Sequence, residues 1–173
     1  MLGEESLSAS LLTEDFGLIR ARSQGARKKG SKMSAGLQTL SRSDVTLLRG
    51  KEGWRMAGAI LETNWARELA PDARRRAARV LELADRLIRG EHEDAELFAV
   101  LSAFLGALAG RSEEDQDAIE MVAVVRLLHA LGLDVGDVYG DSDVYTEETV
   151  ASAREARAEL ITRINRGIAA SGL

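Results

Sequence analysis

The chain has 173 residues, no cysteine, two histidines, one proline and a formal net charge of −5. Without cysteine it has no disulfide, thiol nucleophile or cysteine-ligated zinc, and two histidines are too few for a three-histidine metal site. The longest apolar run, residues 97–109, is shorter than the roughly 20 residues of a membrane span, and no signal segment opens the chain. We therefore expect a soluble, cytoplasmic protein that does not bind membranes.

Charge is distributed unevenly along the chain. Residues 20–55 contain ten basic and two acidic side chains, a local balance of +8, whereas residues 1–19 carry −4 and residues 56–173 carry −9. Alanine follows the same division, because 22 of the 26 alanines come after Met56. These shifts predict a basic N-terminal domain, residues 1–65, and an acidic helical domain, residues 66–173.

Strand signals dominate the first domain. From Ile19 onward apolar or small residues alternate with Arg20 and Arg22, so the two-residue period of a strand places both arginines on one face. Gly17 closes the preceding turn, where a positive φ suits glycine. Residues 25–36 have no apolar periodicity and form a basic loop. The predicted strands are residues 8–12, 18–24, 44–48 and 54–61, which suit a small all-β barrel or sandwich.

Helical periodicity dominates the second domain. Ser112 and Thr146 each precede a helical pattern and suit an N-cap, while His129 and Ile161 fall at positions expected to be buried. The apolar segment 95–109 predicts a central helix that is buried on all sides. The four expected helices begin at Pro71, Ala95, Ser112 and Thr146 and form a small bundle.

Enzyme and metal signals are weak. The sequence has no glycine-rich phosphate loop, serine elbow or paired carboxylates, so we expect no enzyme and no cofactor. His92 and its acidic neighbours lack the spacing of metal ligands. Four aspartates also lack the spacing of an EF-hand and predict a solvated loop; they are Asp134, Asp137, Asp141 and Asp143.

The basic cluster is the strongest functional signal. Cations that follow phosphates, combined with an aromatic face for a base, are what a single-strand binding surface requires. Trp54 alone is more typical of core packing, because strand aromatics usually pack. The arginine run 74–76 extends this surface or pairs with acids across the bundle. The candidate nucleic-acid residues are Arg20, Arg22, Arg27, Lys28, Lys29, Lys32, Arg49, Lys51, Trp54 and Arg55.

Several segments together resemble a known family. They are LLTEDFGLIRARSQGARK at 11–28, SK at 31–32, GLQ at 36–38 and DVTLLRG at 44–50. Their order and spacing resemble the N-terminal OB-fold domain of the RecO family of bacterial DNA repair proteins, over residues 3–62. The helical part, with LLHALG at 127–132, is similar to that family's helical domain more loosely.

The resemblance implies a fold and a function. It implies an α+β multi-domain protein in which an incomplete OB-like β-barrel precedes an all-α bundle. It also implies a recombination mediator that binds single- and double-stranded DNA, promotes annealing and recombinase loading, and works at the bacterial nucleoid. The implied protein partners are RecR and the acidic tail of single-stranded DNA-binding protein. Carried over by position, the DNA-facing residues are Arg20, Arg22, Arg27, Lys28, Lys29 and Lys32, with Arg49, Lys51 and Arg55 as weaker additions.

Two departures from the family limit what is carried over. Many members hold zinc with four cysteines, and this chain has none, so zinc is not expected. Residues 3–6 align with the turn after the family's first strand, so we expect a barrel that lacks this strand and exposes an edge. Either the start lies upstream, or another segment or another chain covers the gap. The alternative function is a protein-interaction adaptor, in which the bundle binds a partner and the barrel is structural.

Overall fold

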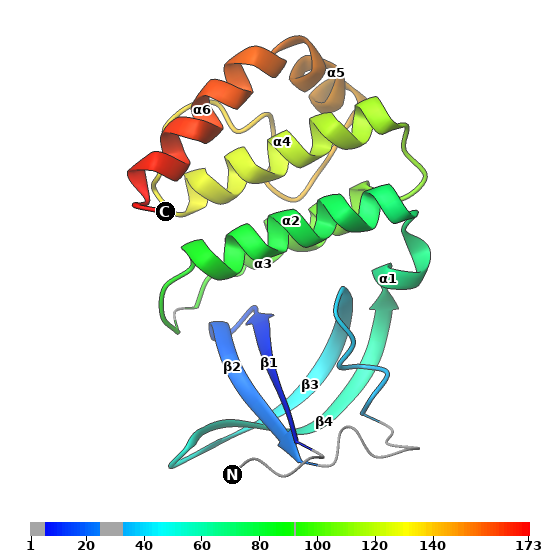
Figure 1. Ribbon diagram of the computed structural model, residues 1–173, viewed down its shortest axis with the longest axis vertical. Coiled ribbons are helices and arrows are strands. Elements are labelled where there is room, and N and C mark those ends of the chain that lie inside the picture. Colours follow the sequence, from blue (N-terminus) through cyan, green and yellow to red (C-terminus); the bar gives the residue numbers. More distant parts are fainter. Residues whose placement is uncertain (1–5, 25–32, 92) are drawn as a thin grey trace. The chain divides into compact units, whose positions relative to one another are not determined.

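The computed structural model describes residues 6–24, 33–91 and 93–173, and it separates into two compact units (Figure 1). The sheet unit comprises residues 1–68 with 90–93, and the helical unit comprises residues 69–89 with 94–173. The sheet unit holds the four strands and the short helix α1, Trp65–Glu68. The helical unit holds α2 to α6.

The sheet has the strand order β1-β2-β4-β3. Two antiparallel hairpins, β1 with β2 and β3 with β4, are joined by a parallel pairing of β2 with β4. Two register shifts in the β3–β4 hairpin are the kind of irregularity that bends a strand. The strands span Ser6–Thr13 (β1), Gly17–Gln24 (β2), Ser41–Gly50 (β3) and Gly53–Asn64 (β4), so β3 and β4 are longer than predicted.

One face of the sheet, here called the inner face, forms the core of the sheet unit. Its buried residues are Ile19, Ala21, Trp54 and Met56. The segment 33–40 packs against it through Met33 and Leu37. Gly36 lies so close to the sheet that a Cβ there would sit 3.0 Å from the Cβ of Ala59. This segment therefore covers part of the inner face.

Side-chain caps begin three of the helices. Ser112 accepts a hydrogen bond from the backbone N–H of Asp115 (3.2 Å), and Thr146 accepts one from that of Thr149 (3.0 Å), which confirms both predicted caps. No helix in the described part of the chain is long and apolar enough to cross a membrane. The helices span Pro71–Leu87 (α2), Ala95–Ala107 (α3), Glu113–Ala130 (α4), Glu147–Glu155 (α5) and Arg157–Ala170 (α6).

Three expectations about the helices are wrong. The central helix is α4, which packs against α2, α3, α5 and α6 and is buried throughout residues 121–128, whereas α3 is only partly buried. The helix predicted from Thr146 is two helices, because the chain leaves the helical conformation at Ala156 (ψ 13°). His129 and Ile161 are exposed, since each lies on the solvent side of its helix. The predicted fold class, an incomplete OB-like sheet followed by helices, is confirmed.

Several arginines of the helical unit are neutralised by acidic side chains. The Arg76 guanidinium is 2.6 Å from the Glu120 carboxylate and 3.2 Å from that of Asp117, so α2 is tied to α4. Glu120 also pairs with Arg79, and Asp117 with Arg157 of α6. Of the two possibilities for the run 74–76, pairing across the bundle therefore holds for Arg76.

Two further arginines hold the loop between α4 and α5, residues 131–146. Arg126 is fully buried and donates hydrogen bonds to the carbonyls of Val138, Tyr139 and Ser142. Arg163 of α6 pairs with Asp134 at 2.5 Å, and both side chains are only 10% exposed. Asp134 is thus part of a buried ion pair, whereas the sequence predicted a solvated loop.

Removal of Arg163 leaves the Asp134 carboxylate buried and unpaired. We expect Arg163→Met to lower the free energy of unfolding by about 3 kcal/mol, the usual cost of breaking a buried pair from one side. Arg157→Met is the matched control, because this arginine is 58% exposed and its partner keeps Arg76; it should cost under about 1 kcal/mol. Equal losses in urea denaturation would contradict this account.

Acid should weaken the same pair. The hydrogen bond from Arg163 lowers the pKa of Asp134 below its ordinary value. A lowered pKa in the folded state adds stability above about pH 4, the pKa of an unfolded aspartate, and this stability is lost as the pH falls through the folded-state pKa. The stability difference between the wild type and Asp134→Asn, measured by denaturation from pH 7 to pH 2, should therefore shrink below about pH 4. A constant difference would contradict this expectation.

Candidate nucleic-acid interface

Strand β2 separates its arginines from the core. Ile19 and Ala21 are 1% and 0% exposed, whereas Arg20 and Arg22 are exposed on the opposite side, here called the outer face. The alternation follows from the two-residue period of a strand, and it confirms the predicted placement of both arginines. The outer face of β2 thus carries two positive charges in the solvent.

The parallel pairing of β2 with β4 adds a third arginine. Arg22 pairs with Arg55, and the preceding pair is Ala21 with Trp54. Because paired residues of neighbouring strands lie on the same face, Arg55 joins Arg22 on the outer face. Ser8 pairs with Arg22, and Leu48 pairs with Arg55, so one row crosses all four strands.

The three outer-face arginines have no counter-charge in the described residues. Neither an ion pair nor a side-chain hydrogen bond holds Arg20, Arg22 or Arg55 there. Arg42 of β3 differs, because its guanidinium is 3.0 Å from the Glu62 carboxylate. Like charges directly opposite each other on neighbouring strands destabilise a sheet. The outer face therefore presents three positive charges that no described side chain neutralises.

Trp54 and Arg49 lie on the other side of the sheet. Trp54 is 8% exposed, and the Arg49 guanidinium carbon lies 4.9 Å from the centroid of its ring system. Arg49 also pairs with Glu91 at 2.7 Å. The candidate residues Trp54 and Arg55 therefore do not share one surface, because neighbouring residues of a strand point to opposite faces.

The Glu91 carboxyl is influenced by both Trp54 and Arg49. The indole N–H of Trp54 and the Arg49 guanidinium lower the pKa of the Glu91 carboxyl. The indole N–H nevertheless has no hydrogen-bond partner of ordinary geometry in the described part of the chain. Arg49 is thus already compensated by a π-face and a carboxylate, in contrast to the arginines of the outer face.

Phe16 is an exposed aromatic residue that the sequence analysis did not single out. Its ring is 41% exposed and lies 4.8 Å from that of Trp54, centroid to centroid. The β1–β2 turn positions it, since Thr13 accepts a hydrogen bond from its backbone N–H and Gly17 adopts a φ of 63°. An aromatic residue in a tight hairpin turn was the available signal.

Five predicted cations remain. Lys51 is exposed in the turn between β3 and β4. Four others lie outside the described residues: Arg27, Lys28, Lys29 and Lys32. The structure thus brings together three of the predicted cations, places Arg49 elsewhere and leaves the loop cluster as a prediction.

Metal-ligating groups do not gather in the described residues. No set of three or more histidine, aspartate and glutamate side chains is placed to hold a metal ion there. His92 lies outside the described residues. The described side chains therefore offer no metal centre.

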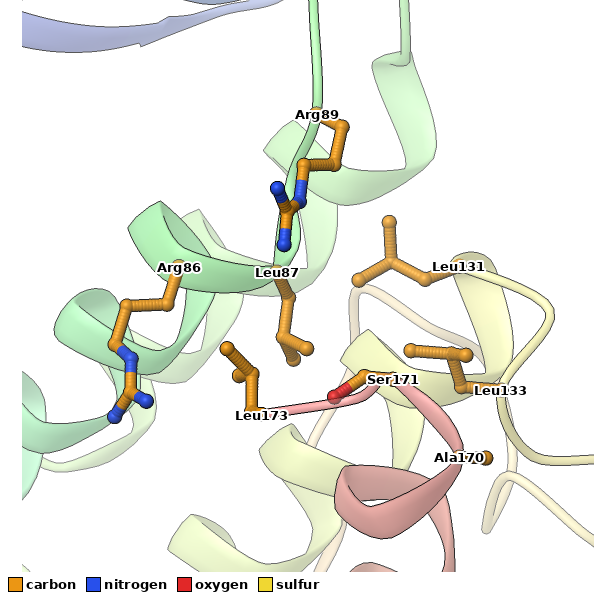
Figure 2. A pocket seen from close by; sticks show the side chains of 8 residues that line it. All are labelled: Arg86, Leu87, Arg89, Leu131, Leu133, Ala170, Ser171 and Leu173. Atoms are coloured by element: carbon orange, nitrogen blue, oxygen red, sulfur yellow. The ribbon is translucent and has the colours of Figure 1, made fainter.

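The helical unit contains a pocket of about 370 Å³. Figure 2 shows Arg86, Leu87 and Arg89 lining it from the end of α2, with Leu131 and Leu133 from the end of α4. The C-terminal residues, including Ser171 and Leu173, complete the lining. Two guanidinium groups beside leucines suit a ligand that is both anionic and apolar.

Comparisons with known proteins identify relatives. Residues 1–57 match the family described as recombination protein O N terminal. A curated relative, the DNA repair protein RecO of Bifidobacterium animalis subsp. lactis, is 33% identical over 152 residues, which cover 83% of this chain. The matched region covers 62% of that relative, so the chain spans less than two thirds of its length.

Repulsion between Arg22 and Arg55 should lower the free energy of unfolding of the protein when no ligand is bound. We expect Arg22→Thr to raise the free energy of unfolding by about 0.5 kcal/mol at low salt, because it removes a like-charge pair and threonine suits a strand. Arg42→Thr, which breaks the pair with Glu62, is the control and should not stabilise. Thermal denaturation measures both variants. Destabilisation by Arg22→Thr would show that Arg22 makes a favourable contact within the protein.

Proposed function

Because the chain is a relative of the DNA repair protein RecO and its N-terminal residues belong to the RecO N-terminal family, we propose that it is a DNA-binding recombination mediator. In this proposal the sheet unit binds single- and double-stranded DNA, and the whole protein promotes strand annealing and recombinase loading. It works without a cofactor, performs no catalysis and acts in the bacterial cytoplasm at the nucleoid.

The row of uncompensated arginines carries this proposal. Arg22 and Arg55 are neighbours on adjacent strands, Arg20 lies on the same face, and none of them is neutralised by a described side chain. The guanidinium group presents its N–H donors in a planar fork that matches phosphate oxygens. A polyanion such as DNA supplies the missing negative charge and relieves the repulsion between the arginines.

The proposal includes protein partners, and the pocket of the helical unit supports one of them. An acidic peptide with apolar residues, such as the tail of single-stranded DNA-binding protein, matches a pocket that combines Arg86 and Arg89 with leucines. RecR is a second proposed partner, for which the described surface offers no specific site. The alternative function, an adaptor, uses this pocket alone and leaves the sheet without a ligand.

A titration with a labelled oligonucleotide tests DNA binding. We expect the affinity to fall steeply with salt, because each phosphate contact on a single strand adds about 0.7 to the slope of log K against log salt. Arg20→Ala combined with Arg22→Ala should reduce this slope by about 1.4 and weaken binding at low salt by about tenfold or more.

Arg42→Ala is the control for this titration, because it removes one positive charge from the same sheet but from a cation that Glu62 already neutralises. It should leave the affinity close to that of the wild type. Absence of DNA binding at low salt, together with binding of the acidic peptide, would favour the adaptor. A loss of binding free energy in Arg42→Ala about half that of the double variant would mean that net charge alone governs binding.

An acidic peptide that ends in an apolar residue tests the pocket. Arg86→Glu combined with Arg89→Glu reverses both charges at its rim and should weaken peptide binding by about tenfold or more, measured by fluorescence anisotropy. Arg154→Glu is the control, since Arg154 lies elsewhere in the helical unit, paired with Glu114. Peptide binding that is unaffected by the pocket variant would exclude this pocket as the site.

A further inference from the structure

The positions of all the aromatic residues are known. The chain has seven, of which only Phe16, Trp54 and Trp65 belong to the sheet unit, and none falls in the undescribed ranges. Trp54 and Trp65 are each 8% exposed. Phe16 lies against Trp54, whose side chain is on the inner face. The outer face therefore carries no aromatic side chain on which a base could stack.

The outer face instead offers hydrogen-bond donors. Ser8 and Ser10 of β1 are exposed and pair in register with Arg22 and Arg20. Guanidinium and hydroxyl groups therefore lie side by side along two strands, and both donate to phosphate oxygens. The row ends on β3 at Leu48, whose side chain is aliphatic and has no π-face. This set of groups matches a sugar-phosphate backbone and lacks the usual means of binding bases.

OB-type domains that bind single strands usually combine a basic groove with aromatic side chains on which bases stack. In this chain the two components are on opposite faces of one sheet, because Arg55 and Trp54 are consecutive residues of β4. Uncompensated arginines on one face and aromatic rings on the other do not serve the same nucleotide. The separation follows directly from the register of β2 with β4.

We propose that the outer face binds the backbone of a single strand through its phosphates and leaves the bases directed away from the protein. This inference rests on the proposed function and adds the part of the DNA that is recognised. The ligand is the sugar-phosphate chain, so base identity does not affect binding. Bases that remain unbound are free to pair with a complementary strand while the first strand stays on the protein.

Two strands of equal length and charge test the proposal on the full chain: an ordinary oligonucleotide and one in which every nucleotide is abasic. We expect both to bind with the same affinity within about threefold, because base stacking would add about fivefold to a hundredfold per base. A 2-aminopurine base placed in the ordinary strand should keep its fluorescence upon binding, since stacking on a side chain would quench it.

Substitutions on the inner side and on the outer face of the sheet should affect strand binding differently. Phe16→Ala removes the exposed ring of the inner side and should bind the ordinary strand as the wild type does. Arg22→Ala combined with Arg55→Ala should weaken both strands equally. A loss of affinity in Phe16→Ala, with normal denaturation, would overturn the proposal.

The outcomes also separate this inference from the proposed function. If neither strand binds at low salt, the proposed DNA binding fails, and the inference fails with it. If the ordinary strand binds and the abasic strand binds at least tenfold more weakly, or the 2-aminopurine is quenched, DNA binding stands and backbone-only recognition is wrong. Equal binding with an unquenched base supports both.

Discussion

The parallel pairing of β2 with β4 determines what each face of the sheet carries. It sets Ala21 beside Trp54 and Arg22 beside Arg55, so one pair enters the core and the next one faces solvent. A shift of one residue in β2 would place Arg22 in the core, and a shift of one residue in β4 would place Arg55 in the core and Trp54 outside. The burial of Ile19 and Met56 on the inner face opposes such a shift, because both would become exposed. Core packing thus fixes the arrangement of the outer-face arginines, although these arginines contribute nothing to the core.

Compensated arginines occur in both units. In the helical unit each of several arginines has a carboxylate or a set of carbonyl oxygens that compensates it, and these contacts join helices or hold a loop. Those arginines are Arg76, Arg79, Arg126, Arg154, Arg157 and Arg163. In the sheet unit Arg42 and Arg49 are compensated as well, whereas Arg20, Arg22 and Arg55 are not compensated within the described residues. The chain's net charge of −5 therefore conceals a local excess of positive charge that is available to a ligand.

Sequence patterns predicted the local features and missed those that depend on long-range pairing. The alternation around Arg20 and Arg22 could be predicted from the sequence because a strand has a period of two residues. The caps at Ser112 and Thr146 could be predicted because capping depends on neighbouring residues only. The pairing of Arg22 with Arg55 could not be predicted from the sequence, because it depends on the register of two strands whose paired residues are 33 positions apart in the chain. The pairing of Arg49 with Glu91 has the same origin, and the break at Ala156 has neither a glycine nor a proline to signal it.

The arginine side chains report directly on the proposed contact between DNA and the outer face of the sheet. NMR spectra of the arginine Nε–Hε groups, recorded while a single-stranded oligonucleotide is added, distinguish the two faces in one sample. The signals of Arg20, Arg22 and Arg55 should shift with increasing oligonucleotide, while those of Arg42 and Arg49 should stay in place. Shifts confined to Arg49, or to arginines of the helical unit, would contradict the claim and move the interface away from the outer face.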